Sequence, residues 1–210
     1  MTSSLNKAMR YLAYALILIV ALYALTYFIP NYQSPFLQHK PLQNTIWRIA
    51  FWTHVGLGAL ALALGPFQLS VKRRQRNLSL HRQLGKLYVI SILLASVGAF
   101  YAAFFADTGW IASVGFATLA VVWFYTTLRA YQTIRQKQVK QHRAWMYRSY
   151  AVTLAAVTLR IILPVEIAVL HLPFTTAYPI VAWLCWGWVP NLIVVEWWLA
   201  RRLVDLSIPQ

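Results

Sequence analysis

Ionisable side chains stand in or beside long apolar runs of this sequence, among them His54, His81, His142, Arg160 and Glu166. Ionisable groups inside apolar segments of membrane-spanning length are costly, and they usually mark proton, ion or cofactor sites. Imidazoles can ligate haem iron, a guanidinium can hold an anionic group, and a carboxylate can carry a proton. These three kinds of chemistry define the functions that the sequence makes possible.

His81 and His142 occupy matching places in the sequence. Each opens an apolar run directly after a basic loop, and each is followed by an arginine, so we expect both at one level of the membrane. Two neutral imidazoles from different helices can bind one haem iron. Small residues recur at helical spacing after His81, beginning with Gly85, and they would either leave room for a macrocycle or permit close helix packing. The alternative for both histidines is an interfacial position beside lipid phosphates.

Arg160 falls near the middle of an apolar run, where an arginine costs about 2.5–3.5 kcal/mol. Eighteen residues, or five helical turns, separate it from His142, so both side chains project from one helix face. Pro164 disturbs the carbonyl of residue 160. We expect Arg160 to point into the bundle, toward His54, a freed carbonyl or an acidic side chain. There it could bind an anion, a haem propionate or a quinone oxygen, or simply hold helices together.

His54 lies in the run 47–70, and two readings stay open for it. It could ligate a second haem, or it could hydrogen-bond within the bundle. The remaining candidate partner, His171, is 29 residues from His142, which is about 43 Å along a continuous helix. This separation argues against a regular di-haem pair.

The two glutamates in apolar runs have different surroundings. Glu166 has Arg160 as its nearest cation, six residues back and on another helix face, so we expect a proton-titrating carboxylate. Glu196 lies among cations and is expected to form an ion pair with Arg148, Arg201 or Arg202.

The elements that position these residues must be membrane helices. Hydrophobic residues make up 60% of the 210 positions and charged residues only 11%, so lipid is the expected solvent. Open strands cannot face lipid, and a spanning helix needs about 20 residues. Six segments qualify, approximately 10–29, 47–70, 82–106, 110–133, 146–170 and 178–200. We therefore predict an all-α, single-domain membrane bundle of six helices, in which the first is an accessory to a five-helix core over 47–200.

The net charge of +15 is carried mainly by short loops beside the apolar runs. Lys and Arg are concentrated before the first helix (Lys7, Arg10), in loops 71–81 and 134–143, and after the last helix (Arg201, Arg202). This alternation predicts that both termini are cytoplasmic in a bacterial inner membrane, and it argues against nucleic-acid binding. The single cysteine, Cys185, excludes an internal disulfide and is expected to be a packing residue.

Four segments together resemble a bacterial family: FWTHVGLGALALALGPFQL, LHRQLGKLYV, HRAWMYRSYAVTLAAVTLR and AWLCWGWVPNLIVVEW. In this order, from about residue 47 to 200, they resemble the predicted membrane proteins grouped as domain of unknown function 2306. That resemblance implies a polytopic membrane fold and brings no established activity. Separately, the segment from His81 to Gly85 is similar to a haem-ligand segment of di-haem transmembrane cytochromes b. This second resemblance implies one candidate haem ligand, His81.

The function we expect is that of a haem-b membrane protein that moves electrons to or from a quinone or a partner subunit. His81 and His142 would ligate the iron, and Arg160 or the basic loops would meet the propionates. The first alternative is a small-solute or proton transporter that uses Arg160 and Glu166. The second is a structural or assembly subunit whose buried charges only hold helices together. Whether the protein is an enzyme stays open at this stage.

Overall fold

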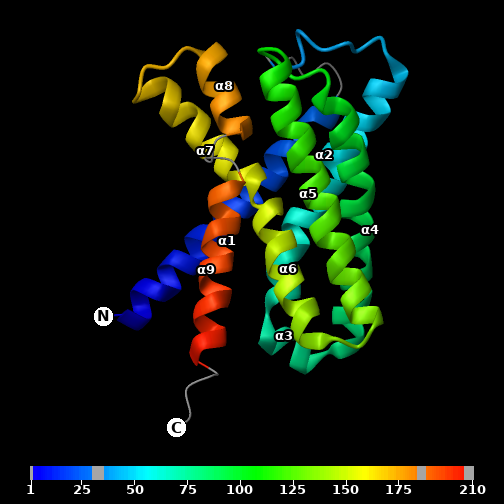
Figure 1. Ribbon diagram of the computed structural model, residues 1–210, viewed down its shortest axis with the longest axis vertical. Helices are drawn as coiled ribbons and strands as arrows, with labels where there is room; N and C mark the ends of the chain where they lie inside the picture. Colours follow the sequence, from blue (N-terminus) through cyan, green and yellow to red (C-terminus); the bar gives the residue numbers. More distant parts are fainter. Residues whose placement is uncertain (1, 30–35, 184–187, 206–210) are drawn as a thin grey trace. The chain divides into compact units, whose positions relative to one another are not determined.

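A computed structural model describes residues 2–29, 36–183 and 188–205, and every regular element among them is a helix (Figure 1). The chain divides into two compact units, residues 1–98 and 99–210, which are described separately. The predicted all-α class is confirmed for the described residues. Cys185 and Trp186 lie outside the described residues, as do the side chains of Lys7, Arg10 and Arg202.

The first unit contains α1 (Thr2–Leu25), the 3-10 turn η1 (Thr26–Phe28), α2 (Thr45–Leu69), α3 (Val71–Arg76) and most of α4 (Leu78–Ala103). Side-chain caps set the boundaries of its helices. The Asn44 side chain accepts a hydrogen bond from the Trp47 amide at 3.1 Å, and Asn77 caps α4 through the Leu80 amide at 2.8 Å. Ser70 separates α2 from the basic helix α3, whose first turn it caps. Such caps satisfy amides that lack a partner inside the helix.

Aromatic side chains join the first helix to the second. Phe51 of α2 stacks on Trp47 with ring centroids 4.8 Å apart, and it meets Tyr27 of η1 edge-on at 5.7 Å. Phe36 completes the group at 5.8 Å from Phe51, and Lys40 lies over the Phe36 ring. Edge-on and stacked aromatic pairs each stabilise beyond the area that they bury. This cluster therefore holds the accessory helix α1 to the core at one end of α2.

Glycines on α4 permit close approach to α2. A Cβ atom placed on Gly98 would lie 2.3 Å from the backbone oxygen of Ala50, and one on Gly85 would lie 3.2 Å from Oε1 of Gln68. Between them, Tyr88, Ile92 and Ala95 are fully buried. The sequence left two uses open for this small-residue stripe, and in the described part of the chain it serves close packing.

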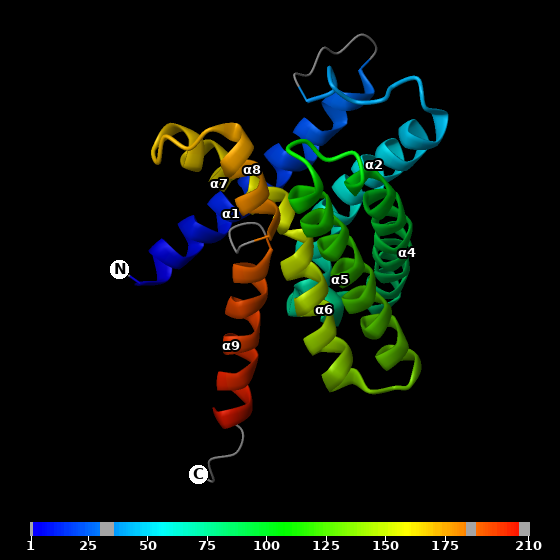
Figure 2. The ribbon, with the colours of Figure 1, turned by 45° about the horizontal axis from the view of Figure 1, so that its top comes forward.

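The second unit contains α5 (Trp110–Arg135), α6 (Val139–Thr153), α7 (Ala155–Ala168), α8 (Phe174–Trp183) and α9 (Val189–Asp205). Helices α5 and α6 form an antiparallel hairpin whose turn includes Lys137 at φ 61°. Helix α9 runs beside α6, and α8 packs on α5 and α7 (Figures 1 and 2). Gly115 of α5 allows the contact with α8, since a Cβ there would lie 2.9 Å from the backbone of Ala182.

Within the described residues, five of the six predicted spans are long and apolar enough to cross a membrane: Tyr11–Phe28, Thr45–Leu69, Leu78–Ala103, Trp110–Arg135 and Val139–Ala168. The last of these is interrupted at Leu154, where α6 ends and α7 begins. The prediction of one unbroken helix over 178–200 is wrong. Helix α8 ends at Trp183, Trp188 lies in a bend, and α9 begins at Val189. Pro190 explains the new start, because proline lacks the amide of an interior position and fits the first turn.

The α2–α4 contact yields a test of packing. We expect Gly98→Ala to destabilise the protein by about 1–3 kcal/mol, because the added methyl group meets a backbone carbonyl that cannot turn aside. Gly85→Ala is the matched control, since its neighbour is the movable end of Gln68. Thermal unfolding in detergent measures both. Equal melting temperatures for Gly98→Ala and Gly85→Ala would contradict this account.

Candidate functional site

Three hydrogen bonds join α5 to α6 at successive levels, and we call this set the α5–α6 seam. Trp123 Nε1 donates to Thr153 Oγ1 at 2.9 Å. The hydroxyls of Thr127 and Ser149 are 2.7 Å apart. Nearer the hairpin turn, Nδ1 of His142 lies 2.8 Å from the backbone oxygen of Ala130. Hydrogen bonds of this kind between membrane helices add specificity to the packing of small residues.

The hydroxyls around the seam also bond to their own helices. Thr153 donates to the Ser149 carbonyl at 2.9 Å while it accepts from Trp123. Thr126 and Thr133 donate to the carbonyls one turn back at 2.8 Å each. All these hydroxyls are buried. Ser149 and Thr153, which follow His142 on α6, are therefore turned toward α5 and engaged in hydrogen bonds, so they do not form an open polar path.

The seam fixes the chemical state of the His142 ring. A backbone carbonyl can only accept, so Nδ1 of His142 must donate to Ala130. In the neutral imidazole the proton is then on Nδ1, and Nε2 carries the lone pair. The ring is half-buried, on the first turns of α6. A histidine whose Nδ1 is held by a carbonyl while Nε2 keeps its lone pair has the arrangement typical of metal-ligating histidines.

The other two candidate ligands lie in the first unit. His81 is half-buried in the first turn of α4, where its amide donates to the Asn77 carbonyl at 3.1 Å. His54 is half-buried on α2, and its backbone amide faces the close approach of Gly98. Among the described residues no cluster of three or more His, Cys, Asp or Glu could hold a metal ion. A haem needs only two protein ligands, so the pairing of His81 with His142 stays a prediction.

Arg160 is half-buried on α7, and its Nη1 donates to the backbone oxygen of Ala156 at 2.8 Å. A carbonyl partner was predicted, namely one freed by a proline. The observed partner, the Ala156 carbonyl, lies one turn before Arg160 and is not the carbonyl of residue 160 that Pro164 disturbs.

Glu166, on the same helix, is only 3% exposed. Its Oε2 atom has no hydrogen-bond partner within the part of the chain that the structure describes. His171 is exposed and adopts φ 53° beyond the end of α7.

Helix α9 is attached to α6 and α7 by polar side chains. Glu196 accepts two hydrogen bonds from Arg148, one from Nε and one from Nη2, the latter at 2.8 Å. The predicted ion pair of Glu196 is thus confirmed, with Arg148 as the partner. The Asn191 side chain donates to the Ala151 carbonyl at 3.1 Å and contacts Thr158 Oγ1 at 3.3 Å. Asn191 therefore bridges the interruption between α6 and α7.

Trp123, Thr127 and Asn191 were not predicted as site residues, because they are neutral and ionisable groups stand out most in an apolar run. Trp123 and Thr127 lie one turn apart on α5, as do Ser149 and Thr153 on α6. The hydroxyl-bearing residues Thr127, Ser149 and Thr153, in two consecutive apolar runs, were a usable signal for an interhelical contact. Asn191, one residue after Pro190, offered no comparable pattern.

Comparison with known proteins agrees with this architecture. One family profile, described as "Predicted membrane protein (DUF2306)", matches residues 51–199. That range contains α3 to α8 entirely, α2 from residue 51 onward, and α9 as far as residue 199. No curated protein and no solved structure matches the chain. The match covers well over half of the 210 residues, and the chain therefore belongs to the DUF2306 family of predicted membrane proteins.

Proposed function

We propose that this protein binds haem b in the membrane and passes electrons to or from a quinone or a partner subunit. The observation that carries the proposal is the hydrogen bond from His142 Nδ1 to the Ala130 carbonyl at 2.8 Å. It orients the ring and leaves the lone pair on Nε2, which is what iron ligation requires. His81 is the second proposed ligand, on the strength of its matching place in the sequence after a basic loop.

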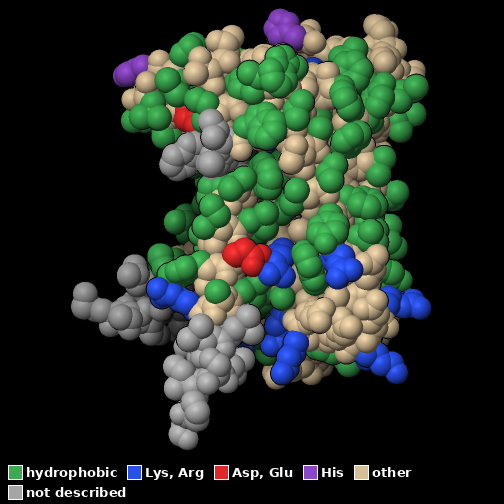
Figure 3. All heavy atoms as spheres, in the orientation of Figure 1, with side chains coloured by type: hydrophobic (Ala, Val, Ile, Leu, Met, Phe, Trp, Pro, Cys, Tyr) green, Lys and Arg blue, Asp and Glu red, His purple; other side chains and the backbone are tan. Residues whose placement is uncertain are grey.

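Basic side chains support the proposal through the propionates of haem. The hairpin end that carries His142 also carries Arg135, Lys137, Lys140 and Arg143. Figure 3 shows Lys and Arg side chains gathered over this end of α6. Haem would supply one-electron chemistry when bound, while the protein sets its potential through ligands and surroundings. The same loop charges support cytoplasmic termini and a bacterial inner-membrane location as part of this proposal.

Absorption spectra test the haem proposal. Full-length protein, expressed with a supply of haem precursor and purified in detergent, should show a Soret band and sharp reduced-minus-oxidised bands of a six-coordinate haem. We expect His142→Ala and His81→Ala each to remove the six-coordinate spectrum, because each change deletes one axial ligand. His171→Ala is the matched control, since this exposed histidine lies outside the seam and should leave the spectrum unchanged.

Two outcomes would refute the haem proposal. One is a colourless wild-type protein that is folded by thermal unfolding. The other is a His142→Ala protein whose spectrum equals that of the wild type. A His81→Ala protein that keeps the six-coordinate spectrum, while His142→Ala loses it, would keep His142 as a ligand and remove His81.

A proton-transfer function is the second candidate, and Glu166 is the observation that favours it. The carboxyl group is 3% exposed, and one of its oxygens has no hydrogen-bond partner in the described part of the chain. Pro164 lies in the same helix, two residues before Glu166, and has no backbone N–H group to donate. Buried carboxylates in spanning segments are common members of proton relays.

Proton flux into vesicles tests this second function. Protein reconstituted into vesicles that enclose a pH-sensitive dye should acidify the interior when a pH gradient is imposed. We expect Glu166→Gln to reduce the flux at least about tenfold, because the amide has a similar shape but cannot release a proton. Glu196→Gln is the control, since that carboxylate is bound to Arg148. Equal flux through wild-type protein and Glu166→Gln, or no flux above empty vesicles, would dismiss this candidate and favour a structural subunit.

A further inference from the structure

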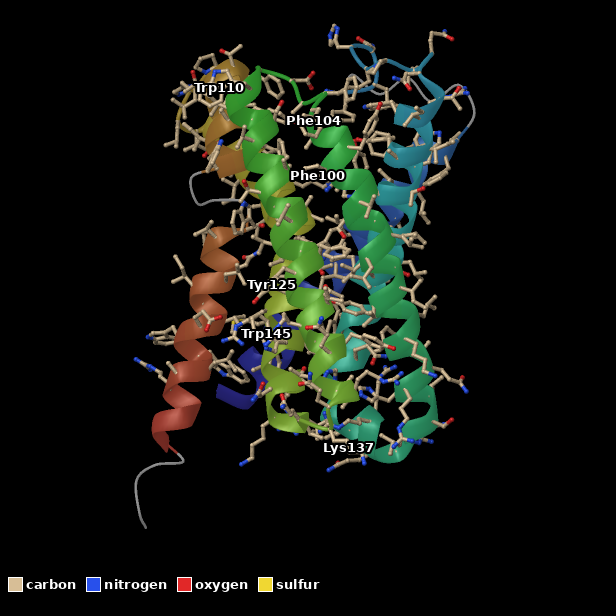
Figure 4. All side chains as sticks on the ribbon, turned by 45° about the vertical axis from the view of Figure 1, so that its right-hand side comes forward. Phe100, Phe104, Trp110, Tyr125, Lys137 and Trp145 are labelled. Atoms are coloured by element: carbon tan, nitrogen blue, oxygen red, sulfur yellow. The ribbon has the colours of Figure 1, made fainter. Side chains whose placement is uncertain are left out.

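An aromatic and cationic group on α5 and α6 is not used by the proposed function. Trp145 is its centre: the Arg148 guanidinium carbon lies 4.6 Å from the ring centroid, and that of Arg129 lies 5.8 Å away. Tyr125 meets the same ring edge-on, with centroids 5.6 Å apart (Figure 4). We call these four residues the Trp145 cluster. Cations over a tryptophan face are held in place by the ring as well as by hydrogen bonds.

The two arginines of the cluster differ in charge compensation. Arg148 is paired with Glu196 through two hydrogen bonds. Arg129 has no acidic partner among the described residues, and its Nη1 makes a 3.3 Å contact with Gln132. Its Nε atom is buried and has no hydrogen-bond partner within the described chain. The side chain as a whole is half-buried, so a phosphate can approach the rest of the guanidinium, whose planar fork it matches.

The depth of Arg129 indicates where such an acceptor would come from. Arg129 lies six residues before the last residue of α5, Arg135, which corresponds to about 9 Å of helix rise. Arg135, Lys137 and Lys140 follow it toward the hairpin turn, so the local field is positive. A position this close to a basic hairpin end corresponds to the headgroup level, where tryptophan and tyrosine are enriched. The acceptor is therefore expected from a lipid.

An apolar surface continues from the cluster along α5. Tyr125 and Val121 follow Arg129 at one-turn steps toward the helix start and are 51% and 53% exposed. Val121 also ends a groove of about 650 Å³ that is lined by Phe100, Phe104 and Val114 among others. Figure 4 shows Phe100, Phe104 and Trp110 around the far end of this groove. Such a surface suits an acyl chain, whereas a free phosphate ion would have no use for it.

We propose that the Trp145 cluster binds the phosphate of an anionic glycerophospholipid, whose acyl chain lies along Tyr125, Val121 and the groove beside Val114. Arg129 supplies the charge and the hydrogen bonds, and Trp145 fixes the guanidinium. A zwitterionic lipid is disfavoured because its amine would face an uncompensated arginine. This proposal is independent of haem, since it involves neither His81 nor His142.

Native mass spectrometry of the full-length protein in detergent tests the lipid site. The protein is titrated with phosphatidylglycerol and, separately, with phosphatidylcholine. We expect wild-type protein to retain phosphatidylglycerol preferentially, and Arg129→Gln to weaken that binding about tenfold, because hydrogen bonds to a charged group are lost. Arg135→Gln is the matched control: it removes an equal charge from the same helix, but at an exposed position against Tyr131.

Two further arms decide between lipid and free phosphate. Val114→Trp should weaken phosphatidylglycerol binding by filling the groove, while inorganic phosphate at millimolar concentration should not displace the lipid. Phosphatidylglycerol binding to Arg129→Gln as tight as to wild type would overturn the proposal, as would equal retention of phosphatidylcholine by the wild type. Displacement by phosphate with no effect of Val114→Trp would replace the lipid by a phosphate ion. If Arg129→Gln does not fold, Arg129→Lys serves, since it keeps the charge and should lose part of the affinity.

Discussion

Polar groups within a bilayer have no water to bond, so they must form hydrogen bonds inside the protein. In the second unit, the α5–α6 seam is where the polar side chains of two helices meet this requirement. The seam places an indole, three hydroxyls and an imidazole against one another or against a carbonyl, from Trp123 at one end to His142 at the other. These contacts are possible only in one register of the hairpin, because a shift of one residue would turn the partners away. The constraint therefore fixes both the packing of α5 on α6 and the orientation of the His142 ring.

The interruption at Leu154 leaves backbone carbonyls of α6 in need of hydrogen-bond donors, and α9 supplies one of them. A helix that ends leaves its last carbonyls without amides, and α6 ends at Thr153. Asn191 donates to the Ala151 carbonyl, while the Leu154 amide still bonds to Tyr150 at 2.9 Å. The Arg148–Glu196 pair adds a second attachment of α9 further along α6. The change of direction between α6 and α7 (Figure 1) is thus supported by side chains from a distant part of the sequence.

Sequence alone could predict the helical class and the position of most helices, because apolar length and charged loops are properties of composition. Asn44, Ser70 and Asn77 likewise mark helix boundaries by their chemistry. The pairing of Glu196 could be narrowed to three arginines, but choosing Arg148 required knowing that α9 packs on α6. The bend before α9 was not predicted, although Pro190 in the following turn is a residue that commonly begins a helix.

The candidate site was also predicted only in part. Its ionisable residues could be recognised from the sequence because a charge in lipid is costly. The neutral residues that orient them could not be recognised in this way. The small-residue stripe after His81 illustrates the limit: glycine and alanine permit either a cofactor or a neighbouring helix, and only the contact of Gly98 with the Ala50 backbone distinguishes these uses. The hydrogen bond between Thr127 and Ser149 depends on the register of the two helices, which composition does not encode.

The central claim is that the seam holds His142 as the tautomer protonated on Nδ1, and nitrogen NMR of the imidazole tests it most directly. The full-length protein would be labelled with ¹⁵N-histidine, studied in detergent without haem, and assigned by comparison with His142→Ala. The account predicts for neutral His142 a protonated Nδ1 and a non-protonated Nε2, with the Nδ1 proton shifted by its hydrogen bond to Ala130. A His142 signal with the proton on Nε2, or rapid exchange between the two tautomers, would contradict it.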